Sequence, residues 1–194
     1  MTSLHAKEII KNLQKKSESF EKGLGDEEVL MIESKFNLTF PPDLRVFLQS
    51  ALPISNSFVN WRLGLSSEEE SEKLTFRLNW PLDGMIFDVK SNDFWFDQWG
   101  NKPEKIEDRI NLATKFYHTY PKLIPIYSHR YIPSQPNQAG NPVFSVHQMD
   151  IVYYGYDLAS YFAKEFQFDL PSNFEILTEP NVEIEFWSHW TVYN

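Results

Sequence analysis

Residues 33–48 read ESKFNLTFPPDLRVFL, and they contain the end of one helix, a short apolar link and the start of another. The two prolines suit a first helical turn, because proline lacks the N–H that this turn leaves unpaired. After them, apolar residues recur at i, i+3, i+4, i+7 and i+8, the spacing of one helical face: Leu44, Phe47, Leu48, Ala51 and Leu52. We expect this helix to end at Pro53 and to bury its apolar face.

Two more helices are expected upstream. Residues 4–20 have a weak apolar face and turn polar at their end, which predicts a loosely packed helix. Asp26 can cap the next helix, which should end near Asn37. The buried face of that helix is predicted to carry Val29, Ile32 and Phe36.

The middle of the chain changes to a two-residue period, which is typical of strands. The alternating apolar residues are Trp61, Leu63 and Leu65, followed by Leu74, Phe76, Leu78 and Trp80. Residues 66–73, SSEEESEK, are expected to form a solvated loop between two strands, and residues 81–84, PLDG, a turn.

The second half predicts a helix, three strand segments and a last helix. Pro103 should open the helix and Pro121 close it, with apolar residues along one stripe between them. Strands are expected within residues 123–133, 142–148 and 150–155, and the simplest arrangement of them is an antiparallel meander. Asp157 can cap a final amphipathic helix over residues 157–166.

Together these elements predict an α+β fold, with N-terminal helices packed on an antiparallel sheet and followed by a C-terminal helix. The chain has 194 residues, among them 16 Phe, 9 Tyr and 6 Trp, which is ample material for one core. We therefore expect a single domain over residues 1–194. Its core should span about residues 26–168, with the helix at 4–20 and the tail at 170–194 as extensions.

The composition restricts the classes of partner. The chain contains no Cys, and its 18 Lys and Arg against 27 Asp and Glu give a net charge of −9. The absence of Cys favours the cytoplasm, and residues 1–16 offer no apolar run for a signal peptide or a membrane span. The negative field disfavours direct nucleic-acid binding and attracts basic partners, although acidic residues can also serve solubility alone.

The sequence contains no signature of a catalytic or metal site. There is no G-x-S-x-G, glycine-rich phosphate loop or H-E-x-x-H motif. Asp88, Asp93 and Asp97 could act as paired carboxylates, but we favour the interpretation that they are solvated or turn-forming residues between aromatic anchors. His129 and His147 could meet on neighbouring strands, yet no two histidines have helical ligand spacing. We expect no metal, no cofactor and no enzymatic activity.

The densest group of recognition-type residues surrounds the Gly/Pro-rich loop after residue 133. Tyrosine and arginine combine contact area with directional hydrogen bonds, as binding surfaces require. The predicted partner-binding residues are Tyr127, His129, Arg130, Tyr131 and Asn141, with Trp95 and Trp99 alongside. The alternative is that Arg130 and His129 only hold the loop in place.

The motif in residues 33–48 resembles the opening signature of the Smi/Knr-like family of the SUKH superfamily, in which a helix, an apolar link, a proline and a second helix follow one another. Residues 80–100, 121–133, 140–146 and 150–162 look like the longer bacterial and plant branch of that family. The resemblance covers about residues 27–166. One departure is residues 51–57, ALPISNS, where most members have an Asn-Gly-Gly turn.

The resemblance implies the same α+β fold and a function in protein binding. Bacterial members of this superfamily resemble immunity proteins that neutralise polymorphic toxins, often nucleases or deaminases, and a fungal relative is linked to cell-wall glucan synthesis. We therefore expect a non-enzymatic binding module whose partner is a protein, with a basic toxin domain as the first candidate. A regulatory adaptor and, less favoured, a hydrolase using the aspartates and His129 are the alternatives.

Overall fold

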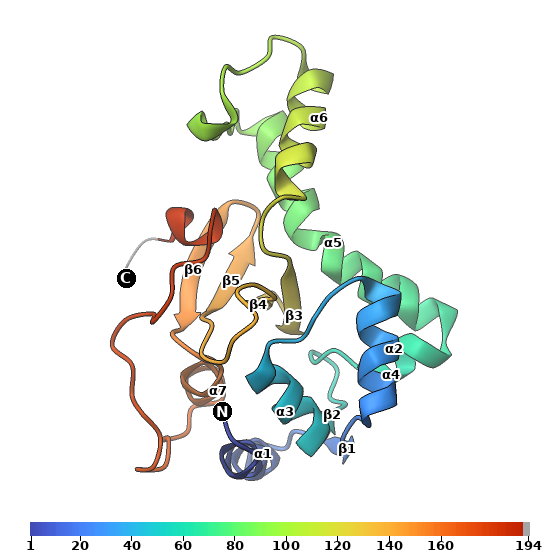
Figure 1. Ribbon diagram of the computed structural model, residues 1–194, viewed down its shortest axis with the longest axis vertical. Coiled ribbons are helices and arrows are strands. Elements are labelled where there is room, and N and C mark those ends of the chain that lie inside the picture. Colours follow the sequence, from blue (N-terminus) through green and yellow to red (C-terminus); the bar gives the residue numbers. More distant parts are fainter. Residues whose placement is uncertain (192–194) are drawn as a thin grey trace.

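The computed structural model describes residues 1–191 as helices gathered around a four-stranded sheet (Figure 1). The sheet has the order β3-β4-β5-β6, and every neighbouring pair is antiparallel. Its strands are β3 (Leu123–Tyr127), β4 (Arg130–Pro133), β5 (Val143–His147) and β6 (Asp150–Gly155). The predicted meander and the α+β class are confirmed. Residues 192–194 of the predicted tail lie outside the described residues.

The N-terminal part consists of α1 (Ser3–Lys15), α2 (Asp26–Phe36) and α3 (Pro42–Ser50). The predicted ends of two helices need correction, because β1 (Phe20–Lys22) and β2 (Ala51–Pro53) pair in a small antiparallel sheet. The sequence predicts the end of the first helix at residue 20 and the end of the third at residues 51–53, but all four are strand residues. Gly25, not Asp26, is the N-cap of α2, and the Glu28 carboxylate accepts a hydrogen bond from the Gly25 N–H at 2.8 Å.

The apolar faces of these helices form a first core with one face of the sheet. Leu44, Phe47 and Leu48 of α3 are buried as predicted. The Phe47 ring lies 4.6 Å from that of Phe162 in α7 (Leu158–Phe166), the predicted C-terminal helix. Asp157 caps α7 by accepting a hydrogen bond from the Ser160 N–H at 2.7 Å.

The two strands expected in the middle of the chain are helices, so this prediction is wrong. Residues 61–66 form α4 (Trp61–Ser66), and α5 (Glu68–Ser91) includes most of the predicted loop, the second strand and the PLDG turn. Two helical stripes with i, i+4 spacing are interleaved here. Leu74 and Leu78 belong to the buried stripe, whereas Phe76 and Trp80 belong to an exposed one. Interleaved stripes of this kind produce the alternation that also characterises a strand.

A second core lies on the opposite face of the sheet, because neighbouring strand residues point to opposite faces. Ile124 and Val143 belong to the first core, and Leu123 and Phe144 to the second. The second core also receives the end of α5, the 3-10 helices η1 (Asp97–Trp99) and η2 (Trp187–Trp190), and α6 (Ile106–Tyr117). The helix predicted between Pro103 and Pro121 is thus shorter than expected.

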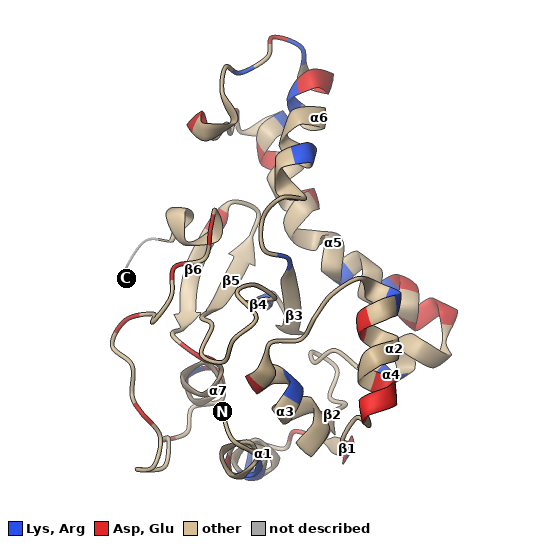
Figure 2. Ribbon diagram, viewed as in Figure 1, with Lys and Arg blue, Asp and Glu red and all other residues tan. Residues whose placement is uncertain are grey.

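Figure 2 shows acidic residues, in red, on the first turns of α5 and on α2, on the same side of the molecule. Within α5 these are Glu68, Glu69 and Glu70, which suit the positive end of the helix dipole. Within residues 1–191, the structure contains no helix with both the length and the apolar character that a membrane span needs.

The buried face of α3 can be tested with Leu48→Ala. We expect the free energy of unfolding to fall by about 2–5 kcal/mol, because the substitution removes buried methyl groups and leaves a cavity. Leu30→Ala is the matched control, since Leu30 on α2 is 60% exposed, and it should cost less than about 0.5 kcal/mol. Equal effects of the two substitutions in urea melts would contradict the core assignment.

Candidate functional site

A groove runs along the exposed face of α5, and we call it the α5 groove. Figure 1 shows α5 as the long helix that rises from α4 to α6 beside the sheet. One wall of the groove is α5, and the other consists of the ends of two β-hairpins. The lining residues are Phe76, Arg77, Trp80, Asp83, Gly84 and Phe87 from α5, and Ser128, His129, Tyr131, His147 and Gln148 from the sheet and its turns.

Three large aromatic side chains of α5 remain exposed along this groove. Phe76, Trp80 and Phe87 are 57%, 38% and 47% exposed. Their i, i+4, i+11 spacing places them on one helical stripe. An aromatic stripe open to water is costly for a folded protein, and contiguous exposed apolar surface of this kind marks interaction sites.

The local sequence explains why α5 forms despite its internal Pro81. Ser67 caps the helix by accepting a hydrogen bond from the Glu70 N–H at 3.3 Å. Lys73 then forms ion pairs with Glu69 and Glu70 at one-turn spacing. The opposite face of the helix buries Leu74, Leu78, Pro81, Met85 and Val89. The buried stripe therefore decides which face of α5 is left for the groove.

Specific contacts hold α5 against the hairpin ends. The Tyr131 hydroxyl donates a hydrogen bond to the Arg77 carbonyl at 3.0 Å, and the Asp88 carboxylate accepts one from the Met149 N–H at 2.8 Å. Between these contacts, a Cβ atom on Gly84 would lie 2.8 Å from the Cα atom of Gln148. Only glycine therefore permits this approach of the helix to the turn.

The groove consists of two hollows of similar size. The first, of about 300 Å³, lies between Phe76 and the Ser128–His129 turn. The second, of about 250 Å³, lies between Phe87 and Gln148. Trp80 and His147 line both hollows and so stand between them.

The described lining of the groove carries one formal charge of each sign, on Asp83 and on Arg77. The Arg77 guanidinium donates hydrogen bonds to the carbonyls of Ser57 and Ser128, at 3.3 and 2.8 Å, and so turns toward the protein. Asp83 is the one acidic residue among the described residues that line the two hollows. His129 is exposed at the surface but partly shielded from water, and this partial desolvation lowers its pKa below the ordinary value; the neighbouring Arg130 and His147 lower this pKa further.

Of the residues predicted to bind a partner, His129 and Tyr131 line the α5 groove. Of these two, only His129 is exposed, because Tyr131 is buried in the second core. The Arg130 side chain is buried as well. Its Nε donates to Glu165 at 2.9 Å, its Nη1 donates to Ser145 at 2.9 Å, and its guanidinium lies 3.7 Å from the Tyr154 ring centre. The alternative considered for Arg130, that it holds the local structure in place, agrees with these contacts.

The other four predicted residues do not line the groove. Two of them, Asn141 and Trp99, are buried. Buried Asn141 donates to the carbonyls of Pro133 and Pro136 and thereby ties the loop to itself. Buried Trp99 donates to the Tyr120 hydroxyl, and half-buried Trp95 donates to the Gly100 carbonyl. Half-buried Tyr127 packs its ring 4.8 Å from that of Phe58. A docking role for these four residues stays a prediction.

Two of the three candidate catalytic carboxylates, those of Asp88 and Asp93, have structural partners, and Asp97 lies in the 3-10 helix η1. Asp88 is buried and accepts from Met149 and Asn92, while Asp93 pairs with Lys102 and Arg109. His129 and His147 meet at the first hollow, as the sequence allowed. Within residues 1–191, no group of three or more His, Cys, Asp or Glu side chains is arranged to hold a metal ion.

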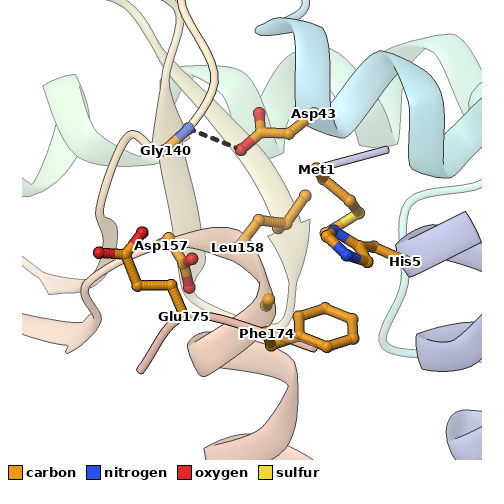
Figure 3. A pocket seen from close by; sticks show the side chains of 9 residues that line it. Met1, His5, Asp43, Gly140, Asp157, Leu158, Phe174 and Glu175 are labelled. Carbon is orange, nitrogen blue, oxygen red and sulfur yellow. Dashed lines mark hydrogen bonds between the residues drawn. The ribbon is translucent and has the colours of Figure 1, made fainter. Parts of the chain in front are cut away.

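A second cavity, of about 130 Å³, lies between α1, α3 and α7 (Figure 3). Asp43 in its wall is buried, and this burial raises its pKa above the ordinary value. One carboxylate oxygen accepts from the Gly140 N–H at 3.0 Å and the other from the Leu44 N–H at 3.0 Å. Asp157, also in the wall, caps α7. Both carboxylates therefore serve the fold.

The sequence interpretation missed Phe76, Trp80 and Phe87 as surface residues. One signal could have revealed them: Ser67 followed by Glu70 has the S-x-x-E pattern that begins many helices. A helix starting there would have separated the alternating apolar residues into two stripes.

Comparison with known proteins found no match for this chain among protein-family models, curated proteins or solved structures. The resemblance to the SUKH superfamily is thus supported by the sequence motifs alone, and it stays a prediction.

The structural role of Arg130 predicts that Arg130→Ala lowers the free energy of unfolding by about 3 kcal/mol, because the partly buried Glu165 would lose its ion-pair partner. Lys73→Ala is the control: it breaks ion pairs on the surface of α5, where Lys73 is 59% exposed, and should leave the melt unchanged. If Arg130→Ala melts like the wild type, Arg130 has no structural role, and its predicted role in docking would be favoured instead.

The position of His129 predicts a pH effect on stability. Beside Arg130 and His147, with Glu165 opposing them, His129 has a lowered pKa in the folded protein. The unfolded chain therefore binds the proton first, so stability should fall as pH drops through about 6.5. His129→Gln should reduce the loss between about pH 7.5 and 5.5 in urea melts. His118→Gln, on exposed α6 surface, is the control, and equal slopes for the wild type and His129→Gln would refute the assignment.

Proposed function

We propose that this chain is a non-enzymatic protein-binding module, most closely of the immunity type, and that it binds its partner through the α5 groove. The observation that carries the proposal is the exposed stripe of Phe76, Trp80 and Phe87. Aromatic side chains that lie in preformed hollows are typical anchors of protein interfaces, where tryptophan above all contributes large shares of the binding energy.

The chemistry of the groove supports binding more than catalysis. Its most exposed side chains are aromatic, and two of the polar groups beside them, Arg77 and the Tyr131 hydroxyl, are occupied by backbone carbonyls. A hydrolase would need a nucleophile, an acid and a base converging on one point. Asp88 and Asp93, which would supply them, have structural partners elsewhere.

A rigid groove also favours binding. The helix wall is fixed by the contacts of Tyr131 and Asp88, and the hairpin wall by the hydrogen bonds of the sheet. A surface that is already ordered loses little entropy on association, so its contacts contribute more fully to affinity. The net charge of −9 adds attraction for a basic partner such as a toxin domain.

A regulatory adaptor would use the same surface, so the identity of the partner separates the two functions. A toxin domain encoded beside this chain would support immunity, and a protein of cell-wall synthesis or signalling would support the adaptor.

The proposal predicts that the tagged protein captures a partner from its own cells and that Trp80→Ala reduces the amount captured at least about tenfold, as removal of a central tryptophan anchor does. Mass spectrometry measures both amounts. Ile176→Ala is the control, because Ile176 is 76% exposed, more than any other large apolar residue within residues 1–191, and does not line the groove.

Thermal melts of both variants verify that each is folded. A partner retained equally by the wild type and folded Trp80→Ala would place the binding surface elsewhere and overturn the proposal.

A further inference from the structure

The division of the α5 groove into two hollows limits what can occupy it. Trp80 and His147 form a ridge, with Phe76 beyond it on one side and Phe87 on the other. An occupant must therefore place one apolar group in each hollow and cross the ridge between them. A single flat ring or a small polar molecule would fill half of the site.

The spacing of the hollows selects a secondary structure for the occupant. The α5 residues that line the first hollow are centred near residue 78 and those of the second near residue 84. At 1.5 Å per residue, the hollows are about 9 Å apart along the helix axis. Two residues seven positions apart on a partner helix are about 10.5 Å apart on the same face, whereas residues four apart are separated by about 6 Å.

The walls also disfavour an extended occupant. The backbone N–H groups of α5 are engaged within the helix, and the hairpins reach the groove with their turns, not with a free strand edge. An extended peptide would lay unpaired backbone groups against aromatic side chains, which costs free energy. A helix satisfies its own backbone and presents only side chains.

The charges around the groove predict which charged residues flank the apolar anchors of the partner helix. Asp83 projects beside the ridge, and the one Lys or Arg among the described lining residues, Arg77, donates to backbone carbonyls. The acidic first turns of α5 continue the same sign beyond Phe76 (Figure 2). A lysine or arginine beside the anchor of the second hollow would meet Asp83, and one beyond Phe76 would meet the acidic first turn of α5, whereas glutamate or aspartate at these two places would be repelled.

We propose that the α5 groove binds an amphipathic helix of a partner protein that carries two large apolar residues seven positions apart, flanked by Lys or Arg. This inference rests on the proposed function, since it names the element through which the partner is held. Trp80 packs between the two apolar anchors, and Asp83 pairs with a basic side chain one turn from them.

The test is selection of random 16-residue peptides displayed on phage, using immobilised wild-type protein and removing peptides that also bind Trp80→Ala. We expect enriched peptides to have net positive charge and a pair of Leu, Ile, Met, Phe or Trp residues at i and i+7. Synthetic copies should gain helical circular dichroism on binding. Their affinity should fall at least tenfold with Trp80→Ala and severalfold with Asp83→Asn, but not with Ile176→Ala.

Enrichment of acidic or proline-rich peptides, or of peptides that bind without becoming helical, would overturn the helix proposal. Self-association of the wild-type protein in sedimentation experiments, lost in Trp80→Ala, would also overturn it, because a second copy would then occupy the groove. These failures leave the proposed function intact if a cellular partner still depends on Trp80. Loss of that dependence would remove both.

Discussion

The close approach of α5 to the hairpin ends is the constraint on which the functional surface depends. Gly84 makes the approach possible, because a side chain there would meet the backbone of Gln148. The hydrogen bonds of Tyr131 and Asp88 fix the helix on either side of that point. Once the helix is fixed in this way, its aliphatic stripe enters the cores and its aromatic stripe must face water. The groove is thus a consequence of how one helix is attached to the sheet.

The sheet can hold α5 in this position because a hydrophobic core covers each of its two faces. Alternate strand residues supply two cores, one with the N-terminal helices and α7, the other with α5, α6 and the C-terminal segment. Arg130 and Asn141, which looked like recognition residues, brace the strands and the loop from inside. The hydrogen bonds that these two side chains donate, to Glu165 and Ser145 and to the carbonyls of Pro133 and Pro136, hold the strands and the loop in one arrangement. Rigidity of the scaffold is what allows a shallow groove to keep its shape.

The sequence predicted the α+β class, the helices α2, α3 and α7 and the strand meander, because each has one dominant periodicity and a clear cap or proline boundary. It failed at α5, where Leu74 and Leu78 alternate with Phe76 and Trp80 and two helical stripes imitate a strand. Periodicity assumes that a helix exposes polar residues, and α5 breaks that assumption on its functional face. The site prediction found His129 and Tyr131 near the groove, but residue type alone could not distinguish the exposed His129 from the buried Arg130. That distinction depends on the ion pair with Glu165, 35 residues away.

Hydroxyl-radical footprinting of the protein alone and with its captured partner tests the central claim most directly, because aromatic side chains oxidise readily when they are exposed. If the partner covers the α5 groove, oxidation of Phe76, Trp80 and Phe87 should fall together in the complex, while that of Met31 on α2 and Ile176 in the C-terminal segment stays unchanged. Unchanged oxidation of the three aromatic residues, with protection of Met31 or Ile176 instead, would contradict the account.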